Sequence, residues 1–188
     1  PDIATTTLSD LRAIVTRDPA AECALVPSLY YKGFKGLAAH RLAHALWGEG
    51  RQGVARFIQS RVADVLAMDI HPAARIGQGV FMDHGTGLVI GETSVVEDDV
   101  SMLQSVTLGG TGKESGDRHP KIRRGVMIGA GAKILGNIEV GEGSKVAAGS
   151  VVLRAVPPHT TVAGVPARPV GTPTSEAPAF DMRQDVDG

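Results

Sequence analysis

An acid and a base stand side by side at Asp83 and His84, inside the segment MDHGTG. The imidazole of histidine has an ordinary pKa of about 6.5, so its neutral form can take a proton from a hydroxyl group near neutral pH. General-base catalysis of this kind contributes roughly 10²–10⁴-fold to a rate. His84 is therefore a candidate general base. The alternative is a surface histidine at a turn that hydrogen-bonds to the backbone.

A second polar segment, GDRHP, occupies residues 116–120. The guanidinium of Arg118 can bind a carboxylate through two parallel hydrogen bonds, which suits a substrate that carries a carboxyl group. Residues 109–170, which contain this segment, hold nine Lys or Arg and four Asp or Glu, a net charge of +5. This excess favours a polyanionic ligand, although chance clustering on a solvated surface explains the charge equally well.

A regular six-residue repeat surrounds both segments. An aliphatic residue or Met recurs at every sixth position in three phased blocks. Three residues after most of these stands a turn-forming residue, with Ala73 and Thr93 as exceptions. A short strand and a tight corner, repeated in this way, predict a parallel β-helix with one narrow core. The predicted core positions are Ile70, Ile76, Met82, Ile90, Val96, Met102, Leu108, Ile122, Ile128, Ile134, Val140, Val146 and Val152, and the turn formers are Gly79, Asp99, Ser105, Gly125, Gly131, Asn137, Gly143 and Gly149.

The repeat is interrupted at two places, and each interruption contains one of the two polar segments. From Met82 to Ile90 there are eight residues, two more than the repeat requires, so the residues between them are expected to project outward. From Leu108 to Ile122 there are fourteen residues, eight too many, and GGTGKESGDRHPK between them is polar and rich in Gly. Insertions in a solenoid map to loops that often form its binding face, so an extruded loop is predicted here.

The chain before the repeat is predicted to be helical. Apolar residues follow i, i+3, i+4 spacing through GLAAHRLAHALW and RQGVARFIQSRVADVLAMD, and WGEGRQG between them is typical of a helix–helix turn. A shorter helix is expected around LRAIVT, ending before Pro19. After the repeat, Pro157 and Pro158 are expected to end the coil because neither can donate to a sheet ladder. The prediction is an α+β chain with a helical domain over 1–68, a β-helix over 69–170 and a mobile tail over 171–188.

Composition restricts the cellular context. Cys23 is the one cysteine, which excludes an internal disulfide and fits a reducing compartment. No run reaches the ~18 apolar residues that span a bilayer, and the first residues lack the apolar centre of a signal peptide. We therefore expect a cytoplasmic protein that binds neither membrane nor nucleic acid.

Six segments together resemble one family: DIHPAARIG, MDHGTGLVIGET, SVTLGGTGK, GDRHPKI, IGAGAKILGNIEVG and AGVPAR. They are similar to the serine O-acetyltransferases, hexapeptide-repeat acyltransferases of cysteine biosynthesis, and the resemblance covers roughly residues 18 to 170. It implies a left-handed β-helix and transfer of an acetyl group from acetyl-CoA to the hydroxyl of L-serine, without a metal. It also implies feedback inhibition by L-cysteine, which competes at the serine site.

The same resemblance implies a role for each polar residue and favours His84 as the general base. Asp69, in AMDIHP, is implied to pair with the far ring nitrogen of His84, as in a catalytic triad whose nucleophile is the substrate. For Asp18 the alternative is a residue at a helix boundary before Pro19. The implied substrate-binding residues are Asp18 and Asp83 for the ammonium group, and Arg118 and His119.

Coenzyme A is implied to bind along the groove between two subunits, largely through backbone amides. Lysine and arginine side chains suit its phosphates, although plain solvation accounts for each of them equally well. A backbone N–H at Gly110 is a candidate for stabilising the oxyanion of the tetrahedral intermediate. The implied cofactor-binding residues are Gly110, Ala130, Lys133, Lys145, Ala148 and Arg168.

The resemblance also implies an assembly. The family forms trimers through the β-helix and hexamers, as dimers of trimers, through N-terminal helices, so a homotrimer or hexamer is expected. Family members have a longer N-terminal helical region than residues 1–68, which implies that the natural protein extends further upstream. Many members bind O-acetylserine sulfhydrylase through a C-terminal Ile, whereas this chain ends in Asp187 and Gly188.

Two other classes of function compete with this interpretation. A zinc-dependent β-helix enzyme, such as a γ-class carbonic anhydrase, needs three histidines that include a close pair. His40 and His44 lie one helical turn apart, but the sequence offers no third ligand near them. A structural or regulatory partner that has lost catalysis would not need an intact set of Asp69, His84, Arg118 and His119.

Overall fold

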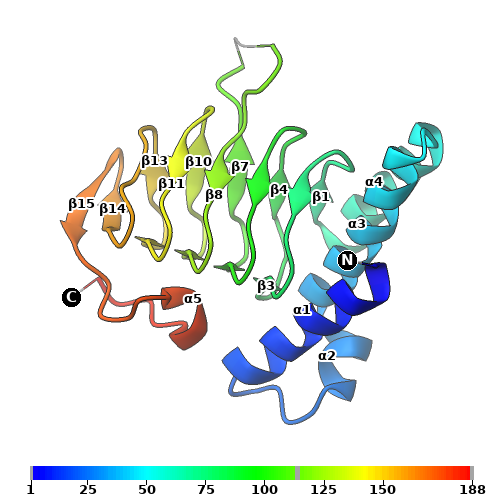
Figure 1. The fold of residues 1–188 in the computed structure, drawn as a ribbon, viewed down its shortest axis with the longest axis horizontal. Coiled ribbons are helices and arrows are strands. Elements are labelled where there is room, and N and C mark those ends of the chain that lie inside the picture. Colours follow the sequence, from blue (N-terminus) through cyan, green and yellow to red (C-terminus); the bar gives the residue numbers. More distant parts are fainter. Residues whose placement is uncertain (1, 113–114, 187–188) are drawn as a thin grey trace.

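The computed structural model of this chain describes residues 2–112 and 115–186. Within these ranges, four helices are followed by short strands that wind into a coil, and one more helix comes near the end (Figure 1). The helices are α1 (Ile3–Arg17), α2 (Leu25–Tyr30), α3 (Lys32–Gly48), α4 (Gln52–Leu66) and α5 (Pro178–Asp181). The strands are β1 (Asp69–Ile70), β2 (Arg75–Ile76), β3 (Phe81–Met82), β4 (Val89–Ile90), β5 (Val95–Val96), β6 (Ser101–Met102), β7 (Thr107–Gly109), β8 (Lys121–Ile122), β9 (Met127–Ile128), β10 (Lys133–Leu135), β11 (Glu139–Val140), β12 (Lys145–Val146), β13 (Val151–Val152), β14 (Thr161–Gly164) and β15 (Ala167–Gly171).

The helices largely follow the sequence patterns. Helix α1 contains the predicted LRAIVT helix but begins much earlier, because the carboxylate of Asp2 caps it by accepting the N–H of Ala4 at 2.8 Å. Helices α3 and α4 are the two predicted amphipathic segments, and Gly50, with φ of 78°, lies in the predicted turn between them. The short helix α2 was not predicted. None of the described helices is both long and apolar enough to cross a bilayer.

The strands form three sheets, one on each face of the coil. Sheet A contains β1, β4, β7, β10 and β13; sheet B contains β2, β5, β8 and β11; sheet C contains β3, β6, β9, β12 and β14, with β15 beside it. The thirteen predicted core residues are the second residues of β1 to β13. All are buried in one cluster except Ile76, which is half-buried and packs against the same cluster. The prediction of a narrow parallel coil with a shared core is confirmed.

The strand register confirms both breaks in the repeat. Ile122 pairs with Val140, which is 18 residues further on, the length of three regular repeats. Ile70 pairs with Ile90 across 20 residues, so the first break adds two residues. Val96 pairs with Ile122 across 26 residues, so the second break adds eight. The second break includes residues 113–114, which lie outside the described residues, and the extruded loop expected there stays a prediction.

The turns between faces stack into three columns. We call them corner A, corner B and corner C, after the sheet whose strands each turn follows. Left-handed backbone recurs in corners B and C, whereas Ala73, Thr93 and Asn137 lie in corner A and have no positive φ. Asn137 has no positive φ, but its neighbour Gly136 in the same corner does, with φ of 96°. The residues with positive φ are Gly79, Asp99, Gly125, Gly143 and His159 in corner B, His84, Gly85, Gly87, Ser105, Gly131 and Gly149 in corner C, and Gly112, Gly116 and Gly136 in corner A.

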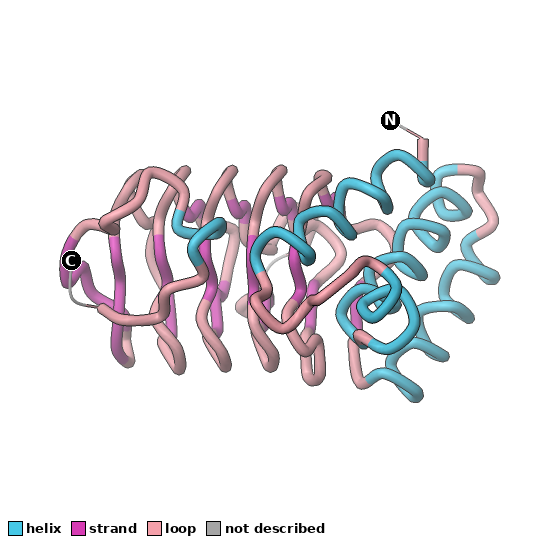
Figure 2. The backbone as a smooth tube through the Cα atoms, turned by 90° about the horizontal axis from the view of Figure 1, so that it is seen from below, coloured by secondary structure: helices cyan, strands magenta, loops and turns pink. Residues whose placement is uncertain are grey.

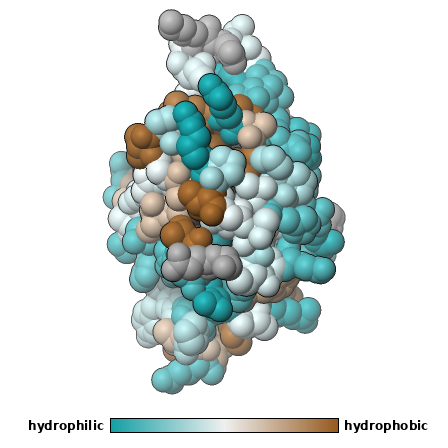
Figure 3. Space-filling view, turned by 90° about the vertical axis from the view of Figure 1, so that its left-hand side faces the viewer, coloured by the Kyte–Doolittle hydropathy of each residue, from teal (hydrophilic) through white to brown (hydrophobic). Residues whose placement is uncertain are grey.

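The coil continues past Pro157 and Pro158, so the expectation that they end it is wrong. Beyond them β14 pairs in parallel with β12. The two prolines lie in corner B, where the chain turns and no ladder requires their missing N–H groups. The parallel coil ends instead where β15 pairs antiparallel with β14. Figure 3 faces this end and shows apolar side chains in small groups among polar ones; Val165 and Val170 are exposed here.

The chain after β15 returns along the coil toward α1 (Figures 1 and 2). Helix α5 contacts β6 and β9 of sheet C and also α1. Ala179 is buried, and its N–H donates to the carbonyl of Gly125 at 3.2 Å. Lys145 forms an ion pair with Asp185 at 3.1 Å. The sequence predicts a mobile tail after residue 170, whereas the described part of this tail packs against the outside of the coil.

Candidate functional site

Three of the predicted site residues, Asp18, Asp83 and His84, line one pocket of about 490 Å³. The pocket lies where the end of α1, the start of α3 and the MDHGTG turn meet. Two carboxylates and an imidazole therefore face one space, and two carboxylates suit a cationic group. The other lining residues are Ala20, Tyr30, Tyr31, Lys32 and Thr86.

The MDHGTG turn has an unusual backbone. His84 takes φ of 57°, which is uncommon for a residue with a side chain, and Gly85 and Gly87 take 75° and 77°. The N–H of Gly87 donates to the carbonyl of Ala67 at 2.6 Å, which ties the turn to the chain just before β1. The His84 side chain is 70% exposed. The two extra residues thus lift an imidazole off the coil, as the sequence predicts.

The start of α3 packs directly on this turn. A β-carbon on Gly33 would overlap the carbonyl oxygen of Met82, and one on Gly85 would stand 2.8 Å from the α-carbon of Gly33. Only glycine at these two positions allows the helix and the turn to approach this closely. The helix thereby holds the backbone on both sides of Asp83.

The carboxylates of the pocket influence each other. Burial raises the pKa of Asp83 above its ordinary value; the neighbouring His84 opposes the rise, and the carboxylate of Asp18 adds to it. The Asp83 Oδ1 and His84 Nε2 atoms are 3.8 Å apart. Burial and a hydrogen bond to Asp18 raise the pKa of the Tyr31 hydroxyl. A bound cation would relieve the repulsion between the two carboxylates.

Asp69 lies close to this turn in the fold but is engaged elsewhere. Its N–H donates to the carbonyl of Leu88 at 2.8 Å, so β1 begins beside the end of the MDHGTG segment. Its carboxylate accepts a hydrogen bond from Gln59 Nε2 of α4 at 2.7 Å. No hydrogen bond joins Asp69 to His84 in the described part of the chain. The pairing of these two residues stays a prediction.

Arg118 and His119 lie in a different place, at corner A. Arg118 Nη2 donates to Glu92 Oε2 at 2.8 Å. The hydroxyl oxygen of Thr93 accepts the backbone N–H groups of Arg118 at 3.0 Å and His119 at 3.1 Å. The His119 ring lies on Gly91, where a β-carbon would overlap it. Burial, followed by the neighbouring charge of Arg118, lowers the pKa of His119.

A single chain does not bring these two groups together. Strand β4 runs from the MDHGTG turn in corner C to Glu92 in corner A. From Leu88 to Glu92 this path covers about 13 Å at ~3.3 Å per residue. Asp18, Asp83 and His84 therefore form one group, at the start of the sheet A strands. Arg118 and His119 form another group, at the opposite end of these strands.

Four of the predicted coenzyme residues, Gly110, Ala130, Lys133 and Ala148, lie at or beside the same two corners, whereas Lys145 on β12 and Arg168 on β15 do not. In corner C the turns stack through backbone hydrogen bonds: Ser105 donates to Thr86, Gly131 to Gln104, and Gly149 to Ala130, at 2.8–2.9 Å. Ala130 and Ala148 belong to this stack, and the Lys133 ammonium donates to the carbonyl of Ser105 beside it. Gly110 lies with Arg118, whose carbonyl oxygen would be 3.4 Å from a β-carbon at Gly110. Lys145 is paired with Asp185, and Arg168 is exposed on β15.

The histidine pair on α3 has structural partners. His40 is buried, and this burial lowers its pKa to about 3. His44 Nδ1 lies 2.7 Å from the carbonyl oxygen of Pro72. In the described ranges, no three His, Cys, Asp or Glu residues are grouped so that they could hold a metal ion.

Sequence reasoning missed several residues at both groups. Tyr31, Lys32 and Thr86 line the pocket, and Glu92 and Thr93 hold the GDRHP segment. The sequence carries no signal for the first three, because they come from a helix start and a turn whose neighbours are set by tertiary packing. Thr93 carries a weak signal, since it is one of the two exceptions to the turn pattern.

Comparison with protein families gives two matches. Residues 119–154 match the family described as bacterial transferase hexapeptide (six repeats), and residues 1–39 match the N-terminal region of serine acetyltransferase. A serine acetyltransferase of Salmonella typhimurium is 61% identical over 188 residues, which are 100% of this chain and 69% of the relative. One of Escherichia coli K12 is 60% identical with the same coverage.

Solved structures show the same similarity. A serine acetyltransferase from Vibrio cholerae superposes with a TM-score of 0.97 at 62% identity, covering 99% of this chain and 72% of that one. One from Brucella abortus, in complex with coenzyme A, gives 0.89 at 60% identity, with 90% and 68% covered. A serine acetyltransferase in complex with cysteine gives 0.96 at 55% identity, with 98% and 72% covered.

Proposed function

This chain belongs to the serine acetyltransferase family, and on that premise we propose how its residues divide the reaction among them. The reaction transfers the acetyl group of acetyl-CoA to the hydroxyl of L-serine and releases O-acetyl-L-serine and coenzyme A, a step of cysteine biosynthesis. The observation that carries the assignment of roles is the convergence of Asp18, Asp83 and His84 on one pocket.

His84 is the proposed general base. Its imidazole is exposed at the pocket and takes the proton of the serine hydroxyl as the oxygen attacks the thioester carbonyl. The tetrahedral intermediate collapses when the carbon–sulfur bond breaks, and the imidazolium returns the proton to the departing thiolate. Asp69 is the proposed carboxylate that stabilises the imidazolium, after its bond to Gln59 is exchanged. The position of β1 beside the MDHGTG turn supports this pairing.

Asp18 and Asp83 are the proposed acceptors for the serine ammonium. A cation between them offsets the repulsion that contributes to the raised pKa of Asp83, so binding favours the charged state of Asp83. Arg118 is the proposed partner of the serine carboxylate, and in the free chain Glu92 already occupies its guanidinium. The substrate carboxylate therefore takes the place of the Glu92 carboxylate on the Arg118 guanidinium. His119 contacts the serine from the same segment.

Because the two groups of residues lie at opposite ends of the sheet A strands, we propose that each complete site combines groups from two copies of the chain. A serine molecule is far too short to reach both corners of one copy. When copies pack side by side around a threefold axis, corner C of one faces corner A of the next. The proposed assembly is a homotrimer, or a hexamer made from two trimers, and the proposed coil is left-handed.

The groove between the copies is the proposed binding site for acetyl-CoA. The stacked turns of corner C supply backbone groups at Ala130 and Ala148, and corner A supplies Gly110, whose N–H is the proposed oxyanion donor. Lys133, Lys145 and Arg168 are the proposed phosphate partners. The complex of the Brucella abortus relative with coenzyme A supports the choice of cofactor.

L-Cysteine is the proposed inhibitor. It carries the ammonium and carboxylate groups of serine, so it fits the same acids and the same arginine, and a relative has been solved in complex with cysteine. The proposed domains are 1–68, 69–170 and 171–188; the start of β1 at Asp69 and the end of β15 at Gly171 support these limits. O-Acetylserine sulfhydrylase is a candidate partner by family resemblance alone.

The experiment that tests this function is a thiol-release assay with acetyl-CoA and L-serine, combined with mass analysis of the amino-acid product. L-Alanine, which lacks the hydroxyl, is the matched control substrate. We expect coenzyme A release and O-acetyl-L-serine with serine only. Equal release with serine and alanine would show that only thioester hydrolysis occurs and would overturn the assignment.

A further inference from the structure

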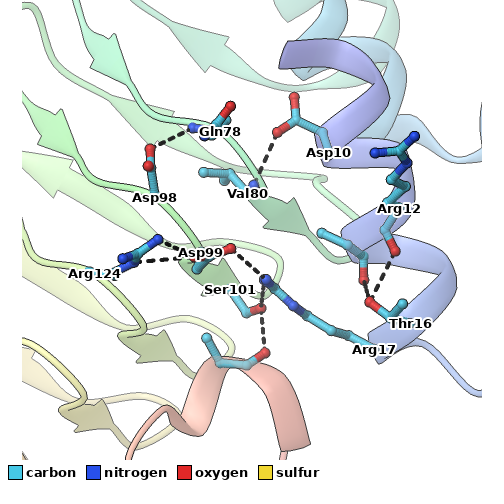
Figure 4. Close-up of polar contacts among 12 residues, drawn as sticks. Asp10, Arg12, Thr16, Arg17, Gln78, Val80, Asp98, Asp99, Ser101 and Arg124 are labelled. Carbon is cyan, nitrogen blue, oxygen red and sulfur yellow. Dashed lines mark hydrogen bonds and ion pairs between the residues drawn. The ribbon is translucent and has the colours of Figure 1, made fainter. Parts of the chain in front are cut away.

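The guanidinium of Arg17 joins three separate parts of the fold (Figure 4). Arg17 is the last residue of α1, yet its side chain is only 2% exposed. Nη1 donates to the hydroxyl oxygen of Ser101 on β6 at 3.1 Å, and Nη2 donates to Asp99 Oδ1 in corner B at 3.3 Å. The Cζ atom lies 4.3 Å from the centre of the Phe180 ring on α5. One side chain thus connects the helical part, the coil and the C-terminal segment.

The partners of Arg17 are themselves fixed. The Ser101 hydroxyl donates to the carbonyl of Ala179 on α5 at 2.8 Å, so Ser101 serves both Arg17 and the C-terminal segment. The Asp99 carboxylate also receives Arg124 Nη2 at 3.0 Å on its other oxygen. Figure 4 shows Asp99 between the two arginines, with α5 below Ser101. The guanidinium is therefore held from several directions rather than by one flexible pair.

The residue after Arg17 is Asp18, which lines the pocket with Asp83 and His84. Its N–H closes α1 on the carbonyl of Ile14 at 2.9 Å, and its carboxylate accepts the N–H of Ala20 at 2.8 Å. These local bonds fix the shape of the helix end but not its place relative to the coil. Further up α1, Asp10 accepts the N–H of Val80 in the coil at 3.0 Å and so docks the middle of the helix. The contacts that dock the end of the helix, next to Asp18, are those of Arg17 and of Ile14, which packs on Phe81 of β3.

We infer that Arg17 is a positioning residue for the amino-acid site: by fixing the end of α1 on Ser101, Asp99 and Phe180, it holds the Asp18 carboxylate opposite Asp83. This inference rests on the proposed function, because it presumes that Asp18 binds the substrate ammonium. The guanidinium does not reach the reacting atoms and acts through the backbone it anchors.

Physical chemistry favours a geometric role over a purely stabilising one. A buried ion pair contributes little net stability compared with apolar residues of the same size, because desolvation offsets the attraction. Burial lowers the pKa of Arg17, which reflects this desolvation, while Asp99 opposes the change. The pair instead fixes the orientation of the Arg17 side chain, because the flat guanidinium donates hydrogen bonds only to acceptors that lie near its plane.

The test is a double-mutant cycle that combines Arg17→Met with Asp18→Asn in the whole chain. Arg17→Met keeps an unbranched, apolar side chain, shorter than that of arginine, and removes both hydrogen bonds. We expect it to raise KM for L-serine about tenfold and to leave KM for acetyl-CoA within about twofold, because misplacement affects only the group that Asp18 binds. In the Asp18→Asn background the same substitution should change KM for serine little, since there is no longer a carboxylate to position.

The matched control is Arg124→Ala, which removes the other arginine on Asp99; in the described part of the chain Arg124 forms no hydrogen bond or ion pair with α1. It should leave KM for serine unchanged. Arg17→Lys should restore part of the affinity, because an ammonium can reach one of the two acceptors. If Arg17→Met does not fold, Phe180→Ala decides by the same ratio of KM values, since that side chain is half exposed and its loss removes the contact on the face of the guanidinium.

The outcomes separate the inference from the function beneath it. If Asp18→Asn leaves KM for serine unchanged, the proposed role of Asp18 fails, and the inference fails with it. If Asp18→Asn raises KM for serine but the Arg17 and Phe180 variants do not, the inference alone is overturned. Equal changes in both KM values, or full additivity in the cycle, would also overturn it.

Discussion

The backbone of Gly33 lies directly against the backbone of Gly85: a β-carbon on Gly85 would stand 2.8 Å from the α-carbon of Gly33. Helix α3 therefore touches the turn that carries Asp83 and His84 without an intervening side chain. The position of the proposed base depends on two glycines that take no part in the chemistry.

Gly85→Ala should destabilise the protein by about 1–3 kcal/mol, because the new methyl group both meets α3 and imposes a strained φ of 75°. Activity should fall with stability as the turn shifts. Thermal unfolding and the thiol-release assay measure the two effects. Gly50→Ala is the control, because Gly50 has φ of 78° and open space around its position. Equal losses in both variants would show that the contact with Gly33 has no effect.

His84→Ala should reduce kcat/KM by roughly 10²–10⁴-fold, the usual contribution of a general base. The fold should survive, because the side chain is 70% exposed. Initial rates of coenzyme A release across a range of pH measure the loss. His159→Asn, which replaces another exposed histidine with positive φ, should retain full rate. A fully active His84→Ala variant would refute the assignment.

Mixing two inactive variants tests whether the site is shared. His84→Ala and Arg118→Ala each remove one half of the proposed site. In random mixed trimers about one quarter of the sites regain both native halves if the halves come from neighbouring copies. The measurement is activity after the two variants are unfolded together and refolded, with each variant refolded alone as the control. Activity no higher than that of the separate variants would place both residues in one copy.

Thr93→Val should raise KM for L-serine about fivefold or more, because the Thr93 hydroxyl accepts the backbone N–H groups of both Arg118 and His119. Valine keeps the shape and removes the acceptor. Steady-state kinetics with serine as the varied substrate measure the effect. Thr107→Val on β7, where a β-branched residue suits the strand, is the control. An unchanged KM in Thr93→Val would mean that the segment is held by other contacts.

Asp83→Asn should gain stability relative to the wild type as pH rises through the acidic range. Burial raises the pKa of Asp83, so the folded state binds a proton more tightly than the unfolded state. The proton stabilises the fold at low pH, and this contribution is lost as pH rises from the ordinary value of 3.8 through the raised one. The stability of Asp83→Asn relative to the wild type should therefore increase over this range. Urea unfolding at several pH values measures it, and a difference that decreases with pH would contradict the argument.

The coil could be predicted because its core side chains depend on the local repeat alone. All thirteen core positions, and the two- and eight-residue breaks, follow from the spacing of six residues between successive aliphatic residues or Met. Ala73 and Thr93 could not be explained from the sequence, since only the three-sided winding reveals that they lie in corner A, where the turns after β1 and β4 have no positive φ. Pro157 and Pro158 misled for the same reason, because a proline pair fits a corner as well as a chain end.

Side-chain partners were harder to predict than positions. The convergence of Asp18 on Asp83 and His84 depends on how α1 docks, and residues 65 apart in sequence give no local sign of it. Asp69 accepts a hydrogen bond from Gln59 and Arg118 donates to Glu92, and both partners are brought into reach by the tertiary fold. No repeat or motif in the sequence determines these hydrogen-bond partners.

The antiparallel strand β15 also decides where the molecule stops. A stack of parallel strands carries an open edge at each end and would polymerise end to end if both stayed uncovered. At one end β15 reverses direction and places Pro169, which has no N–H, in the outermost strand. At the other end Leu37 of α3 and Leu66 of α4 pack on the core. With the strand edges covered at both ends, copies cannot join by continuing the sheets, and the flanks of the coil stay available for the proposed pairing of corner C with corner A.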